Sequence, residues 1–260
     1  MIEAHAGSTP LVLSMPHVGR GIPAGLAARM TARALAVPDT DWHVERLYAF
    51  ARARGAAWLE PHHSRYVVDL NRPPDDAALY AGQVSTGLCP RETFEGEPLY
   101  VDAGPSAAEV AERRGAYWQP YHAELAALLA AARARHGYAL LLDAHSIRSR
   151  VPRLFPGRLP DINLGTHDGR SCDPSLAAAV VAVLGAQTSF SHVLNGRFKG
   201  GYITRHYGSP ERGVHALQIE LAQCAYMDEA TAAYDAGRAA PLVRLLEEVV
   251  TALLAFRPHQ

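Results

Sequence analysis

Two short apolar runs in this chain each end at a histidine. The run that begins at Leu11 ends at His17, and the run that begins at Leu140 ends at His145. Short apolar runs bounded by Gly or Pro are typical of strands buried inside an α/β protein. Because ligands and metals bind beyond the carboxyl ends of such strands, the two imidazoles are expected at one edge of a sheet.

Helix-like and strand-like segments alternate along the chain, which predicts an α/β fold. Strands are predicted near residues 11–17, 57–60, 65–70, 140–145 and 215–221. Helices are predicted at 23–35, at 40–55 with Thr40 as N-cap, at 106–136 as one helix or two, at 173–184 and at 230–256. The Gly- and Pro-rich stretches 75–105, 148–173 and 195–207 are predicted as loops. We find no internal repeat and no linker, so a single domain over residues 1–260 is expected, its sheet covered on both faces.

Composition and charge argue against several classes of protein. The net charge is −1 with both signs interleaved, so no basic face for nucleic acid is expected. No secretion signal and no apolar run of bilayer length is found. The three cysteines form neither a disulfide framework nor a Cys-x-x-Cys site. These features predict a soluble, cytoplasmic protein, and they leave its oligomeric state open. Gly-x-Ser-x-Gly, His-Glu-x-x-His, Walker A and dinucleotide-binding motifs are absent from the sequence.

The two histidines are candidate metal ligands. A catalytic zinc needs three protein ligands, often two histidines and a carboxylate. Taken singly, His17 or His145 is equally well explained as a core histidine bonded to the backbone, but two at strand ends favour a metal. Asp41 is the candidate carboxylate, with His43 and Glu45 as alternates. Taken alone, Asp41 is better explained as an acid at a helix start. Zinc, cobalt, iron and manganese all suit such a site.

Two acidic residues are candidates for supporting roles. Asp143, close to His145, is suited to orient that imidazole as a hydrogen-bond partner. Glu220 closes the apolar strand at 216–219, where a buried acid needs a partner or a function. Beside a metal, such an acid accepts the proton of an attacking water and passes it to a leaving amine. The alternative is a glutamate that emerges into solvent.

Arginines and an amide gather around a predicted strand exit. Arg65, Asn71 and Arg72 lie within one short segment, and Arg205 follows the Gly200-Gly201 turn. An arginine fork matches a carboxylate, and an asparagine adds a directional donor. A single exposed arginine is usually a solvated surface group. Several beside Gly- and Pro-shaped backbone indicate a substrate that carries one or more carboxylates.

The chain resembles the N-formylglutamate amidohydrolase family, also called N-formylglutamate deformylase, from about Leu11 to Leu221. The resemblance lies in motifs that occur in the family's order: Pro16-His17-x-Gly19, Thr40-Asp41-Trp42, Ser64 to Pro73, Asp143-Ala144-His145-Ser146, Gly200 to Arg205, and Gln218-Ile219-Glu220. The block Asp69-Leu70-Asn71-Arg72-Pro73 is the most specific of them.

The resemblance implies hydrolysis of N-formyl-L-glutamate to formate and L-glutamate, the last step of one bacterial route of histidine degradation. The family is related in fold to zinc carboxypeptidases and aspartoacylase, which implies a three-layer αβα architecture with a mixed, mostly parallel sheet. In those relatives an Asn-Arg pair binds the substrate carboxylate and a late glutamate is the base, matching Asn71, Arg72 and Glu220. Carboxypeptidases have His-x-x-Glu where this chain has His17-Val18-Gly19-Arg20, so the carboxylate ligand must come from elsewhere.

Together these observations predict a zinc amidohydrolase that acts on a small molecule. His17, Asp41 and His145 would hold Zn²⁺ or another divalent ion, Glu220 would be the base, and Arg65, Asn71, Arg72 and Arg205 would bind the two carboxylates. Three alternatives remain: an amidohydrolase for another N-acyl amino acid, a metallopeptidase, and a catalytically silent carboxylate-binding protein. The silent protein is expected to lack Glu220 or a histidine ligand, and this chain has both.

Overall fold

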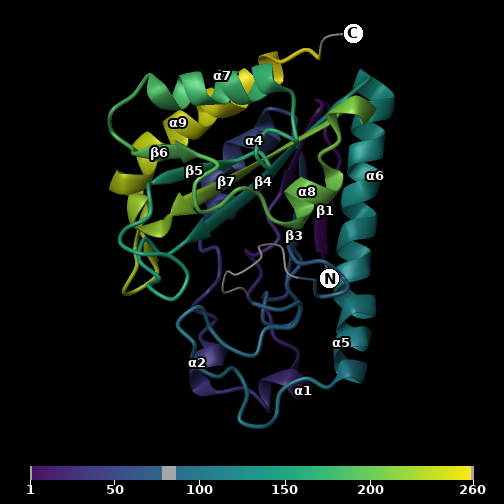
Figure 1. Ribbon diagram of the computed structural model, residues 1–260, viewed down its shortest axis with the longest axis vertical. Coiled ribbons are helices and arrows are strands. Elements are labelled where there is room, and N and C mark those ends of the chain that lie inside the picture. The colour runs from purple at the N-terminus through teal and green to yellow at the C-terminus, as the bar shows by residue number, and fades with distance from the viewer. Residues whose placement is uncertain (1, 78–85, 259–260) are drawn as a thin grey trace.

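A seven-stranded mixed sheet lies at the centre of the computed structural model, which describes residues 2–77 and 86–258 (Figure 1). The strand order is β1-β3-β2-β4-β7-β5-β6. β1 pairs antiparallel with β3 and β5 pairs antiparallel with β7, while the other neighbours are parallel. The strands are β1 (Ile2–His5), β2 (Leu11–Ser14), β3 (Ala57–Pro61), β4 (Ala139–Ile147), β5 (Ile162–Gly165), β6 (His192–Leu194) and β7 (Val214–Ala222). The predicted mixed, mostly parallel sheet is confirmed.

Helices cover both faces of this sheet, as the three-layer prediction requires (Figure 1). One layer contains α3 (Val44–Leu47), α4 (Ala49–Ala53), α7 (Pro174–Gly185) and α9 (Ala236–Ala255). The other contains α6 (Gln119–His136) and α8 (Tyr202–Tyr207). The short helices α1 (Ala24–Ala27) and α2 (Ala32–Leu35) lie among loops at the end of the molecule away from α7 and α9. A small hairpin joins β8 (Met227–Asp228) to β9 (Ala233–Tyr234). Among the described residues, no helix has both the length and the hydropathy needed to cross a membrane.

The acidic and amide side chains of the two central strands, β4 and β7, gather on one face. Side chains alternate between the faces of a strand, so Leu142 and Leu217 pack toward α7 and α9, while Leu141 and Ala216 pack toward α6. Toward the carboxyl ends, the face that α6 and α8 cover becomes polar. We call this part the polar end; it consists of Asp143, His145, Gln218 and Glu220.

The segment 65–70, predicted as a strand, forms turns instead. The N–H of Val67 donates to the carbonyl of Ser64, and the N–H of Asp69 donates to Leu88 at 2.7 Å. The turns let Arg65 and Asp69 bind each other, with Arg65 Nη2 2.6 Å from Asp69 Oδ2. In a strand, residues four apart are separated by roughly 13 Å, so this buried ion pair is incompatible with the predicted extended chain.

Thr40 does not cap a helix, contrary to the prediction. Its hydroxyl donates to the carbonyl of Val37, and α3 begins only after His43, whose φ is 63°. Asp41 is therefore not at a helix start. Its N–H donates to the carbonyl of His17 at 3.1 Å, which fixes its backbone beside the loop that follows β2.

Two strands on one side of the sheet, β5 and β6, were not predicted. β5 falls within the stretch 148–173, and β6 precedes the Gly-rich stretch 195–207. Both are short and lack the apolar length that marks β4 and β7. Of the predicted loop 75–105, residues 75–77 and 86–105 contain no helix or strand, and residues 78–85 lie outside the described part.

The predicted helix at 106–136 is one long rod with a wider turn inside it. Ser106 and Glu109 form a capping box at the start of α5 (Ala107–Arg113), and Gly137, with φ 82°, ends α6. Between them, residues Arg114–Trp118 form a π-helix, closed by a bond from the Gln119 N–H to the Arg114 carbonyl. Pro120 explains this turn, because its ring has no N–H and would crowd a carbonyl four residues earlier in an α-helix.

Candidate active site

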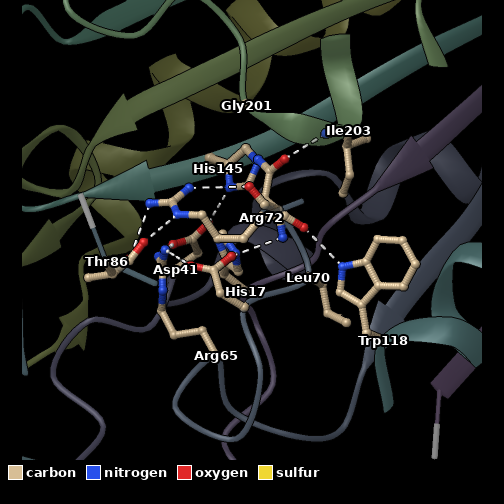
Figure 2. A network of polar contacts seen from close by, with 12 residues as sticks. His17, Asp41, Arg65, Leu70, Arg72, Thr86, Trp118, His145, Gly201 and Ile203 are labelled. Carbon is tan, nitrogen blue, oxygen red and sulfur yellow. Dashed lines mark hydrogen bonds and ion pairs between the residues drawn. The ribbon is translucent and has the colours of Figure 1, made fainter. Parts of the chain in front are cut away.

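Three buried side chains bring metal-binding atoms together at the carboxyl ends of β2 and β4. His17 follows β2, His145 lies in β4, and Asp41 comes from the loop before α3. Asp41 Oδ2 is 2.9 Å from His145 Nδ1 and 3.6 Å from His17 Nδ1. One potential ligand atom from each residue lies within 4.8 Å of the others. Figure 2 shows these side chains pointing toward one another. The sequence prediction of a shared site for these residues thus agrees with the geometry.

Two further carboxylates hold the outer nitrogens of these imidazoles. His17 Nε2 is 2.8 Å from Asp69 Oδ1, and His145 Nε2 is 3.0 Å from Asp143 Oδ2. When a carboxylate binds the Nε2–H of a histidine, Nδ1 is left with its lone pair for a metal. Asp143 was expected in this role, whereas Asp69 was not. The turn at 65–70, which sequence reasoning missed, is what places Asp69 there.

The chemistry of this donor set fits a cation. Among the described residues, His17 Nδ1 and Asp41 Oδ1 have no hydrogen-bond partner although both are buried. Burial favours neutral His145, but Asp143 and Asp41 raise its pKa well above the ordinary value. Burial likewise opposes ionisation of Asp41, but the hydrogen bond from His145 and the nearby charge of His17 hold its pKa below the usual range. Positive charge is therefore favoured at this point, and the residues fit a divalent ion.

The alternates proposed for the carboxylate ligand do not join this group. His43 Nε2 is 2.8 Å from the carbonyl of Ala232, and its ring contacts Tyr234. Glu45 lies on α3 and is only half-buried. Asp41 is thus the carboxylate that the structure brings to the two histidines.

Glu220 lies beside this group on β7. It pairs across the sheet with His145, and it is 7% exposed. Burial raises the pKa of Glu220 to about 8, the charge of His145 lowers it, and that of Asp41 raises it again. A carboxyl group whose pKa lies near neutrality is suited to take up and release a proton.

The segment that carries Asn71 and Arg72 is held from several sides. The Trp118 indole donates to the carbonyl of Arg72 at 3.0 Å, and His122 Nε2 lies 2.9 Å from the carbonyl of Leu70. Asn71 accepts the N–H of Ile203 at 2.8 Å and donates to Asp143 at 3.2 Å. Figure 2 shows Ile203 above Trp118, with a dashed contact from each to this segment. Its backbone is therefore fixed before any ligand binds.

The Arg72 guanidinium is oriented but not saturated. Its Nε and Nη2 donate to the carbonyl and hydroxyl oxygens of Thr86 at 2.8 and 3.1 Å, and Nη1 donates to the carbonyl of Asn71. A guanidinium carries five N–H donors. Within residues 2–77 and 86–258, these bonds use three of the five donors and leave one N–H on each terminal nitrogen for a ligand such as a carboxylate.

The other two predicted arginines differ in their surroundings. Arg65 is 7% exposed, pairs with Asp69, and lies 3.8 Å from Asp41 through Nη1. Its guanidinium also lies over the ring of Phe94. Arg205 donates through Nε to the carbonyl of Gly200. In the described part of the chain it is not among the residues that line the cavity.

A cavity of about 710 Å³, open to solvent, joins these groups. The predicted residues that line it are His17, Arg65, Asn71, Arg72, His145 and Glu220. Gln218 and Arg197 line it as well, and sequence reasoning gave neither a role. Gln218 was identifiable because it shares a strand face with Glu220, two residues away. Arg197 lies in a loop whose position no local pattern determines.

Comparison with known proteins places this architecture in a family. Residues 9–227 match the family described as N-formylglutamate amidohydrolase. The chain is 54% identical over 252 residues to the N-formylglutamate deformylase of Pseudomonas aeruginosa, covering 96% of this chain and 94% of that one. It is 48% identical over 258 residues to the enzyme of the same name from Pseudomonas putida, covering 98% and 96%. The crystal structure of N-formylglutamate amidohydrolase from Ralstonia eutropha JMP134 aligns with a TM-score of 0.82 at 28% identity, covering 97% of each chain. The chain belongs to the N-formylglutamate amidohydrolase family.

Proposed function

We propose that this protein hydrolyses N-formyl-L-glutamate to formate and L-glutamate. The observation that carries the proposal is the convergence of His17, His145 and Glu220 in one cavity with the Arg72 fork, while Asp41 approaches both histidines. The relatives from both Pseudomonas species are named for this substrate. From the composition of the chain we propose the cytoplasm as its location. From the family resemblance we propose that its reaction ends one bacterial route of histidine degradation.

His17, Asp41 and His145 are the residues that would hold a divalent ion, and we propose Zn²⁺. Nδ1 of each histidine and a carboxylate oxygen of Asp41 supply the donors, and Asp69 and Asp143 fix the imidazole orientations. When bound, such an ion polarises a carbonyl group and lowers the pKa of water.

Glu220 is the proposed proton acceptor. Its carboxylate takes the proton of the water that attacks the formyl carbon. It then delivers that proton to the amide nitrogen as the C–N bond breaks, which releases the amino group of glutamate. Its raised pKa suits both steps, because a strong acid would not hold the proton between them.

The two carboxylates of the substrate need cationic partners. The outer edge of Arg72 offers two N–H groups to one of them, and Arg197, which lines the same cavity, is our candidate for the other. Arg65 is bound to Asp69, so its main role is to neutralise the acidic cluster around the histidines and to present its remaining donors to the reacting carbonyl. Asn71 holds Asp143 and α8 and lines the cavity. Direct contact of Asn71 or Arg205 with substrate stays a prediction.

Formate release tests the proposal. Protein purified without chelators is assayed with the N-formyl, N-acetyl and N-succinyl derivatives of L-glutamate, and its metal is identified by X-ray absorption. We expect formate release that is lost on chelation and restored by Zn²⁺. Faster hydrolysis of the acetyl or succinyl compound would assign a different acyl group. Undiminished formate release after complete removal of metal would refute the metal role of His17, Asp41 and His145.

A further inference from the structure

The side-chain amide of Gln218 lies between two groups of known polarity. The backbone N–H of Gly201 donates to Gln218 Oε1 at 2.7 Å, and Gln218 Nε2 donates to Glu220 Oε2 at 3.2 Å. An amide can in principle be turned end over end. Here a backbone N–H can only donate, so the oxygen must face Gly201 and the NH₂ group must face Glu220.

The position of Gly201 makes this orientation rigid. A Cβ atom at residue 201 would lie 2.4 Å from Nδ2 of Asn71, so the glycine backbone is packed directly against that amide. Asn71 is in turn fixed by Asp143 and by the N–H of Ile203. The Gly201 N–H therefore cannot move away from Gln218 without disturbing the Asn71 contacts.

The strand geometry places Gln218 and Glu220 on one face of β7. Gln218 is 4% exposed, and its neighbours across the sheet are Asp143 on β4 and Gly165 on β5. On this face of β7, two residues before Gln218, the apolar Ala216 packs toward α6, so packing alone would be met by an apolar residue at position 218 as well. A buried amide persists here only because both of its ends are satisfied.

We propose that Gln218 is a positioning residue for the reaction, which holds the carboxylate of Glu220 in the direction of the cavity. This inference rests on the proposed function, since it assigns Glu220 the proton transfer. A glutamate side chain has several rotatable bonds, and a donor fixed at Oε2 restricts them before substrate arrives. The hydrogen bond also stabilises the ionised carboxylate that accepts the proton. Gln218 itself exchanges no proton with substrate.

The test compares Gln218→Met and Gln218→Asn with wild type and with a control, Gln187→Met. Methionine preserves volume without hydrogen bonds, and asparagine keeps the amide but is too short to bridge both partners. Gln187 is a suitable control because its amide also joins backbone groups, accepting from Phe190 and donating to Leu184 and Phe190. It belongs neither to the cavity lining nor to the metal-binding group.

We expect kcat to fall about tenfold to a hundredfold in both Gln218 variants. KM should change by less than about twofold and metal content should equal that of wild type, because the lost interaction acts on the chemical step. Gln187→Met should keep the wild-type kcat. Thermal unfolding of all four proteins shows whether each is folded, and kcat is expressed per metal-loaded molecule.

Three outcomes overturn the inference. Wild-type kcat in either folded Gln218 variant would show that Glu220 needs no support from the amide. A loss confined to KM or to metal content would assign Gln218 to substrate or metal binding instead. If wild type prefers another N-acyl glutamate, N-formyl-L-glutamate is not the substrate, and kcat of the variants is then compared with that of wild type on the preferred compound. If wild type hydrolyses none of the three, the proposed function and the roles of Glu220 and Gln218 fail together.

Discussion

The two faces of the central strands β4 and β7 differ although both are buried. Toward α7 and α9, the side chains are Leu140, Leu142, Leu217 and Ile219, whose contacts are replaceable by others of similar volume. Toward α6 and α8, the polar end carries groups with fixed partners, such as Gln218 with Glu220 and Asp143 with His145. One face thus supplies folding free energy in proportion to area. The other uses directional bonds to hold polar groups in fixed orientations beside the cavity, and changes there should affect catalysis before stability.

The largest effect is expected from Glu220→Gln on the polar end. Removing the proposed proton acceptor should lower kcat for formate release by about 10²–10⁴-fold. Stability should change little, because the lost carboxyl is one that burial disfavours in its charged form. The control is Glu60→Gln on β3, a half-buried glutamate that accepts the indole N–H of Trp58. A similar loss of kcat in both variants would show that the polar end has no special role.

The opposite result is expected from Leu142→Ala on the apolar face. Leu142 is 1% exposed, and truncation leaves a cavity, so the free energy of unfolding should fall by about 2–5 kcal/mol. Urea denaturation measures this loss. For the folded fraction, kcat and KM should remain those of wild type. A specific fall in kcat at low temperature, where the variant is fully folded, would mean that the two faces are not separable.

A pH-dependent change in stability is expected from His122, which lies on α6, the helix that covers the face of the polar end. Burial lowers its pKa to about 4, a bond to the Leu70 carbonyl opposes this, and nearby His206 adds to it. The unfolded chain has a histidine pKa of about 6.5. Between these values the unfolded state binds more protons. The contribution of neutral His122 to the free energy of unfolding is therefore fully present above about pH 6.5. It declines by about 3 kcal/mol as the pH falls toward 4.

His122→Gln tests that decline, since glutamine retains a donor for Leu70 without titrating. Denaturant unfolding of both proteins at several pH values between about 4.5 and 7 should give a shallower loss of stability in the variant. Parallel curves would show that His122 is not the group responsible.

The smallest effect is expected from Gly201→Ala. The new Cβ would meet the Asn71 amide at 2.4–2.6 Å, so the segment bearing Arg72 must shift. We expect KM for N-formyl-L-glutamate to rise about tenfold, since one good hydrogen bond to a charged group is worth about 1.5–3 kcal/mol. The backbone φ of −79° at Gly201 suits alanine, so the fold should persist. Gly185→Ala on α7, where a Cβ meets nothing within 4 Å, is the control. An unchanged KM in Gly201→Ala would show that the Asn71 packing does not govern substrate binding.

The sequence predicted the strands that place His17, His145 and Glu220, because a short apolar run and the polar residue that ends it form a local pattern. It also indicated Asp41, although for a reason that the fold does not support, since the loop holding it is no helix start. Asp69 was found only with the structure, because its contact with His17 depends on turns that resemble a strand in composition. Arg197 reaches the cavity from a loop after β6, an edge strand of three residues. The positions of Asp69 and Arg197 depend on contacts between distant parts of the chain, which no local sequence pattern reveals.

The π-helical turn at Arg114–Trp118 determines in which direction the side chains of α6 face relative to those of α5. Each residue of an α-helix turns by about 100°, so one extra residue in a turn rotates everything that follows. Before it, α5 binds peripheral loops through Glu109 to Arg29 and Arg113 to Tyr100. At its last residue and one turn beyond, Trp118 and His122 bind the carbonyls that flank Asn71. Deleting one residue here would give a continuous α-helix. The side chains of Trp118 and His122 would then be rotated away from the carbonyls of Arg72 and Leu70. In this rod, the number of residues matters as much as their identity.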